Sequence, residues 1–108
     1  MERIRFKMKK IINGRKYDTE TAKELGYWCN GYNLNDFDYE EETLYQKKNG
    51  EFFIFGQGGA RSAYSGLDGN WHCAGSAIIP IDEERAKQWA EQNLKADEYE
   101  KIFGEVEE

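Results

Sequence analysis

Residues 40–57 have the sequence EEETLYQKKNGEFFIFGQ, and this stretch decides the fold. Asn49-Gly50 is a strong signal for a tight turn, and strand-forming residues flank it on both sides. We therefore predict a β-hairpin with a two-residue type I′ turn at Asn49 and Gly50. The outgoing arm, residues 52–55, is apolar at every position, which predicts a central strand covered on both faces.

The chain before this hairpin contains three further local signals. In residues 9–18, KKIINGRKYD, two short arms flank Asn13-Gly14, which predicts a small hairpin. Asp18 and Thr19 then precede the run AKEL and Gly26, a pattern that predicts a capped helix of two turns closed by a glycine. The aromatic residues 27–39 are broken by asparagines and a glycine, and indicate a strand followed by an irregular loop.

The chain after the hairpin ends in helices. Residues 71–81 indicate one more strand, in which Gly75 marks a bulge or a close approach of backbones. Asp82 is a suitable N-cap for a helix with an apolar face made by Ala86, Trp89 and Ala90, and residues 96–103 predict a final short helix. The sum is an α+β domain: a small antiparallel sheet of about four strands, with a short N-terminal helix and a C-terminal helix packed on it.

Length and composition limit the class of protein. The 108 residues, 39% hydrophobic and 15% aromatic, fit one folded domain, which we place at residues 8–108 after a basic extension at residues 1–7. No apolar run is long enough for a membrane span, and no apolar segment follows the charged start, so we expect a soluble intracellular protein. Cys29 and Cys73 belong to no metal or redox motif, and we expect two buried free thiols.

The charge is distributed unevenly along the chain. The net charge is -6, yet residues 1–16 carry seven basic residues against Glu2. Residues 36–51 carry six acidic residues against two lysines, and residues 82–108 carry ten against four basic residues. Such an acidic surface disfavours a phosphate backbone and favours a basic protein partner.

The glycine-rich stretch GQGGARSAYSG, residues 56–66, does not fit a phosphate-binding loop. From Gly56 the dinucleotide pattern fails because Arg61 stands where the third glycine is needed, and no long helix is predicted to follow. A P-loop needs a lysine, and none lies between Glu51 and Asp82. We therefore expect no nucleotide cofactor. We interpret the glycines as residues that let the backbone turn away from the sheet.

Catalytic chemistry has few candidates. His72 is the single histidine, and its neighbour Cys73 points to the opposite face of the predicted strand, so the two do not form a catalytic pair easily. A metal site would require convergence of the acidic residues around residues 36–42. Arg61 differs from both, because it is the only basic residue from Glu51 to Ile81 and lies in a loop of small residues, where binding residues are common.

Three segments resemble a family of small proteins carried by phages and mobile elements of Gram-positive bacteria. They are MKKIINGRKYDTETAKELG, TLYQKKNGEFFIFGQGGARSAY and IIPIDEERAKQWAEQNL, and the Y-D-T-E-T-A element at residues 17–22 is the most specific. Some members of this family are similar to anti-CRISPR proteins that inhibit the type II RNA-guided nuclease. The pair Phe52-Phe53 departs from the family pattern, which often has a tryptophan there, and no catalytic motif is carried over.

The resemblance implies a non-enzymatic inhibitor in the cytoplasm of the bacterial host. It would bind the basic surface of a CRISPR effector nuclease and block guide RNA assembly or DNA cleavage, with possible indirect competition with guide RNA. We expect no cofactor, no metal, no membrane contact and no small-molecule substrate. The expected partner-binding residues are Asp36, Asp38, Glu40, Glu41, Glu42, Arg61 and Tyr64.

Two alternatives stay open. One is a small nuclease acting on guide RNA, which would use His72 or the acidic residues with a divalent metal. The other is a phage accessory protein that binds a different host protein.

Overall fold

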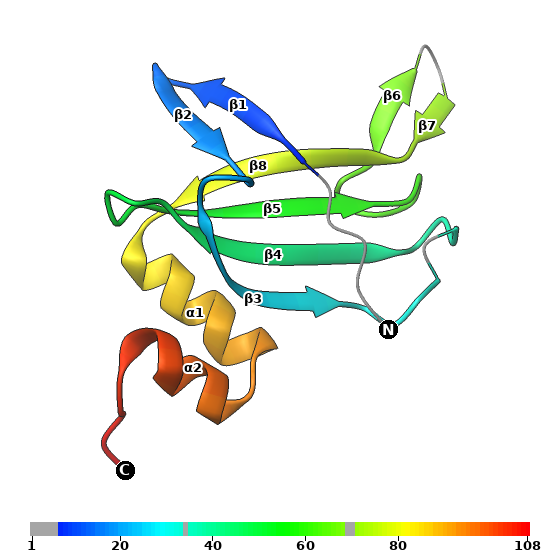
Figure 1. The fold of residues 1–108 in the computed structure, drawn as a ribbon. Coiled ribbons are helices and arrows are strands. Elements are labelled where there is room, and N and C mark those ends of the chain that lie inside the picture. The colour runs from blue at the N-terminus through cyan, green and yellow to red at the C-terminus, as the bar shows by residue number, and fades with distance from the viewer. Residues whose placement is uncertain (1–6, 34, 69–70) are drawn as a thin grey trace.

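The computed structural model describes residues 7–33, 35–68 and 71–108. A four-stranded antiparallel sheet forms the middle layer, with strand order β3-β4-β5-β8 (Figure 1). The hairpin β1-β2 covers one face of this sheet, and two helices lie on the other. The strands of the sheet are β3 (Lys23–Cys29), β4 (Glu40–Gln46), β5 (Phe52–Gly58) and β8 (Gly75–Ile81). The remaining elements are β1 (Lys9–Ile12), β2 (Arg15–Asp18), the small hairpin β6 (Gly66–Asp68) and β7 (Trp71–Cys73), and the helices α1 (Glu83–Asn93) and α2 (Ala96–Phe103). The predicted α+β class is confirmed.

Strand β5 is the centre of the core, as its apolar sequence predicts. It pairs with β4 on one side and β8 on the other. Phe52 and Ile54 face the helices and pack in one cluster with Trp89 of α1. Phe53, which is fully buried, and Phe55 face the β1-β2 hairpin, where Tyr17 meets the Phe53 ring edge-on at 5.5 Å. Two apolar layers therefore cover the strand, one on each face.

The two asparagine-glycine turns differ in geometry. At Asn13-Gly14 both residues have positive φ, 52° and 77°, and Ile12 pairs with Arg15, so this turn is the two-residue type I′ turn. At Asn49-Gly50 the same prediction is wrong. Lys47 donates its N–H to the Glu51 carbonyl at 2.7 Å, so three residues form the loop, and only Gly50 has a positive φ, 95°. This is the longer hairpin turn, in which a glycine follows a type I turn.

The predicted N-terminal helix is wrong. Residues 23–29 form β3, the edge strand that pairs with β4, and only a turn follows Asp18. The Asp18 carboxylate does accept the N–H of Glu20 at 2.9 Å, so the capping signal is real, but the turn is not continued. Gly26 does not cap a helix; a Cβ there would lie 2.7 Å from the Leu94 side chain, so its role is close packing against the end of α1.

The last third of the chain agrees largely with the sequence. The single strand predicted at residues 71–81 is two strands, interrupted before Gly75, where a Cβ would lie 2.2 Å from the Tyr64 carbonyl oxygen. Close approach of backbones, as predicted, is thus why glycine is needed there. Asp82 is the N-cap of α1 and accepts the N–H of Arg85 at 2.8 Å. Ala86, Trp89 and Ala90 are the buried residues of that helix.

Three further expectations concern the surface of the molecule. Cys29 and Cys73 are both exposed, so the expected burial of these thiols is wrong; each is the last residue of a strand. The extension predicted at residues 1–7 lies, except for Lys7, outside the described residues. Neither α1 nor α2 has the length and apolar character that a membrane-crossing helix requires.

Candidate functional site

The glycine-rich stretch brings two loops together at one end of the sheet. After Gly58 the chain forms a turn-rich loop, residues 59–65, and this loop packs on the described part of the β3-β4 loop, residues 30–33 and 35–39 (Figure 1). A Cβ on Gly59 would lie 2.4 Å from the Asp36 carbonyl oxygen, and one on Gly56 would lie 2.0 Å from the Tyr64 ring. Neither glycine has a positive φ, so close packing is the reason for both.

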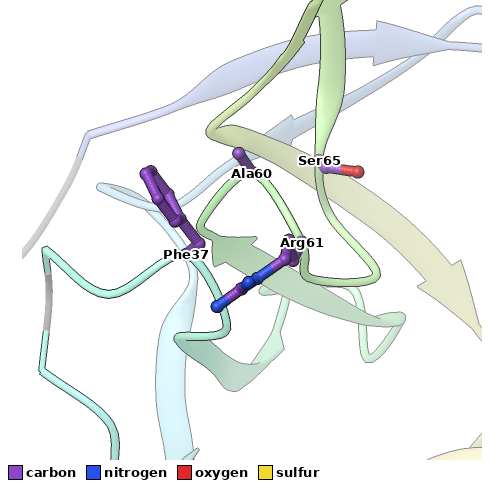
Figure 2. Close-up of a pocket in the computed structure, with 4 residues that line it drawn as sticks. All are labelled: Phe37, Ala60, Arg61 and Ser65. Atoms are coloured by element: carbon purple, nitrogen blue, oxygen red, sulfur yellow. The ribbon is translucent and has the colours of Figure 1, made fainter.

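Arg61 makes an exposed contact between these loops. Its N–H donates to the Phe37 carbonyl at 2.7 Å, and its guanidinium donates to both carboxylate oxygens of Asp38, at 3.1 and 2.9 Å. The guanidinium carbon lies 5.5 Å from the centre of the Phe37 ring. Figure 2 shows both side chains at an open pocket of about 420 Å³, which Ala60 and Ser65 also line. An arginine is thus held in a fixed orientation beside an aromatic ring that is 61% exposed.

Two of the other predicted carboxylates stabilise the same loops through hydrogen bonds to backbone N–H groups. Asp36 accepts the N–H of Asp38 at 2.8 Å, which shapes the β3-β4 loop. Glu40, at the start of β4, accepts the N–H of Ala63 at 2.5 Å and so ties the second loop to the sheet. These carboxylates therefore have a structural role whatever else they bind.

Glu42 links the loop to helix α1. Its carboxylate accepts hydrogen bonds from the Trp89 indole N–H, at 3.0 Å, and from the Tyr64 hydroxyl. Burial, and after it the hydrogen bond to Glu42, raises the pKa of Tyr64 well above its ordinary value, so this phenol stays neutral. The Tyr64 ring lies over Gly56, which explains why this position of β5 has no side chain.

Glu41 lies on the opposite face of the sheet from Glu40 and Glu42. It is buried, and its carboxylate accepts hydrogen bonds from Tyr27, at 2.5 Å, from Tyr39 and from Gln57. Burial and the Glu41 contact raise the pKa of Tyr39 to about 12, and the pKa of Tyr27 is raised further by the same causes. Because successive strand residues point to opposite faces, this separation could be read from the sequence.

These contacts therefore place six of the seven predicted residues in or beside the two loops at one end of the sheet. Phe37 and Trp89 were missed: no local signal distinguishes an exposed phenylalanine in a loop, and the contact of Trp89 with Glu42 spans 47 residues. The predicted binding role of the set stays a prediction. Within the set, Arg61 is exposed, and the other six residues are buried or half-buried.

The nuclease alternative, with a metal ion or with His72, is supported by no arrangement of side chains among the described residues. Among the described residues, no group of three or more His, Cys, Asp or Glu is placed to hold a metal ion. The side chain of His72 lies outside the part of the chain that the structure describes. The chain matches no protein-family model, no curated protein and no solved structure.

Proposed function

We propose that this protein is a non-enzymatic inhibitor, carried by a phage or mobile element, that binds a type II RNA-guided nuclease in the bacterial cytoplasm. The kind of target comes from the resemblance of the Y-D-T-E-T-A and I-I-P-I segments to proteins similar to anti-CRISPR inhibitors. The mode of action, binding to a protein through a preformed surface, is supported by the geometry of the loops.

The observation that carries this proposal is the exposed Phe37–Arg61 pair. Aromatic and arginine side chains dominate the energetics of protein interfaces, because they contribute large contact areas and several hydrogen bonds. Here the arginine is already oriented by Asp38, and the loops are packed on the sheet, so little conformational entropy is lost on binding. An exposed phenylalanine beside such an arginine is a suitable anchor for a partner.

The charge of the molecule supports a basic partner. Exposed carboxylates are concentrated on α1, α2 and the residues after them, against few exposed basic residues; they are Glu83, Glu84, Glu91, Asp97, Glu98, Glu105, Glu107 and Glu108. RNA-guided nucleases hold their guide duplex in a positively charged channel. A negatively charged protein is attracted to that channel and competes there with guide RNA or target DNA. We favour guide loading as the blocked step.

The test is a binding titration with the purified guide-free nuclease. Arg61→Glu places a carboxylate beside Asp38 and removes the guanidinium from Phe37, and Phe37→Ala removes the exposed ring. We expect each to weaken binding about thirtyfold or more, the size of an interface hot spot. Because Phe37 is exposed, its truncation should leave the free energy of unfolding almost unchanged.

A matched control is available in the β1-β2 hairpin. Arg15 has the same side-chain exposure as Arg61, 63% against 65%, and is also paired with a carboxylate, that of Glu51. Arg15→Glu should bind as the wild type does. Equal losses for the two arginine variants would contradict a specific contact at Arg61, and no binding by the wild type would overturn the proposal. Retention of a different host protein would then favour an accessory role.

A further inference from the structure

The two helices and the C-terminal segment line a second, open pocket, remote in sequence from the loops. It has a volume of about 370 Å³ and lies between α1 and α2. The apolar residues that line it, called its floor below, are Ala90, Leu94, Ala96, Tyr99 and Val106. Glu91 of α1 and Glu100 of α2 supply its carboxylates, and no lysine or arginine is among its described lining residues.

The C-terminal segment is folded back so that it completes this pocket. Gly104 ends α2 with a φ of 94°, and the chain turns there before its last residues (Figure 1). Val106 then donates its N–H to the Glu100 carboxylate at 3.1 Å. The Val106 side chain nevertheless stays 60% exposed, so an apolar residue is fixed at the pocket without being buried there.

The carboxylates of the pocket have few hydrogen-bond partners within the described part of the chain and can accept bonds from a ligand. Within the described part of the chain Glu91 has no hydrogen-bond or ion-pair partner, and Glu100 accepts only the Val106 N–H. A carboxylate accepts up to about four hydrogen bonds. An apolar floor with two such acids beside it is complementary to an apolar side chain flanked by lysine or arginine, and is opposed to an acidic one.

We propose that the α1-α2 pocket, with Val106, is a docking site for a basic amphipathic segment of a protein partner. One aliphatic or aromatic side chain of that segment occupies the floor, and two basic residues pair with Glu91 and Glu100. A helical segment satisfies this pattern with residues at i, i+3 and i+4 on one face. The inference rests on the proposed function for the identity of the partner, the nuclease, but not for the chemistry of the site.

The first experiment needs no nuclease. A 14-residue amphipathic peptide of lysine and leucine is titrated into the isotope-labelled protein, and backbone amide shifts are followed by NMR. We expect saturable shifts at the pocket residues, centred on Leu94 and Val106. A lysine-only peptide and a glutamate-leucine peptide of equal length should give no saturable shifts there. Shifts that map to another surface, or equal effects of all three peptides, would overturn the inference.

Variants then separate the site from general charge. Glu91→Gln combined with Glu100→Gln, and separately Val106→Ser, should each weaken the lysine-leucine peptide at least tenfold. The control is Glu83→Gln with Glu84→Gln, the same change of charge at exposed positions of α1 outside the pocket, which should change affinity less than twofold. Equal losses in the two double variants would contradict a specific site.

Binding to the guide-free nuclease distinguishes failure of the site from failure of the function. If the wild type binds and the pocket variants bind equally well, the docking inference is wrong and the proposed function stands. If the peptide occupies the pocket but the nuclease does not bind, the proposed function is wrong and the site stands. Self-association in analytical ultracentrifugation that the pocket variants abolish would show that a second copy occupies the pocket, which also overturns this inference.

Discussion

At the scale of single residues, the glycines after β5 determine how the candidate site is built. Gly56 and Gly59 leave room for the Tyr64 ring and for the β3-β4 backbone, and so let two loops lie close on the sheet. The sequence predicts that these glycines let the backbone leave the sheet. It does not predict which side chain fills the space over Gly56, because Tyr64 approaches from a loop without a periodic pattern. The predicted set grouped Glu41 with Glu40 and Glu42, although the alternation of strand residues would have separated them.

Gly56→Ala tests this packing. The added Cβ would collide with the Tyr64 ring, so we expect the free energy of unfolding to fall by about 1–3 kcal/mol, measured by urea denaturation. The control is a double-mutant cycle with Tyr64→Ala, in which the alanine at residue 56 should cost clearly less because the ring is gone. The same cost in both backgrounds would mean that Tyr64 does not occupy that space.

At the scale of elements, a local sequence pattern predicts the correct helix or strand where the contacts with neighbouring elements favour the same structure. The apolar run of β5 is buried on both faces of the sheet, as predicted. Asp82, followed by two glutamates, caps α1 as predicted. The predicted helix at residues 18–26 fails because pairing of β3 with β4 outweighs a helical segment of only two turns. Edge pairing depends on contacts between distant residues, which a single sequence does not display.

Asp82→Ala tests the cap of α1. The Asp82 carboxylate satisfies the N–H of Arg85, and its loss should lower the free energy of unfolding by about 1 kcal/mol. Gln88→Ala, at an exposed position within the same helix, should have almost no effect because alanine is a good helix former. Thermal or urea unfolding compares the two, and equal effects would argue against the cap.

At the scale of the whole molecule, three tyrosines make stability sensitive to alkaline pH. The pKa values of Tyr27, Tyr39 and Tyr64 are raised in the folded protein, by burial first and by carboxylate neighbours second. In the unfolded chain a tyrosine ionises near pH 10. The folded state therefore binds more protons above that pH, and the stabilisation, fully present below about pH 10, is lost as the pH rises further.

We expect the free energy of unfolding to fall between pH 10 and pH 12, by up to about 1.4 kcal/mol per pH unit for each tyrosine that stays protonated. Urea unfolding at several pH values measures this slope. Tyr39→Phe removes one of the three hydroxyls and should make the slope shallower. An unchanged slope in this variant, or stability that does not fall above pH 10, would contradict the buried tyrosine contacts.

The whole-molecule claim is that this protein stops a type II nuclease by occupying its guide-binding surface. The most direct measurement is the rate of DNA cleavage at low salt, with the protein added either before or after guide RNA. Wild type and Arg15→Glu should slow cleavage strongly when added first and weakly when added last, and Arg61→Glu should inhibit in neither order. Full cleavage in the presence of excess wild-type protein, in both orders, would contradict the account.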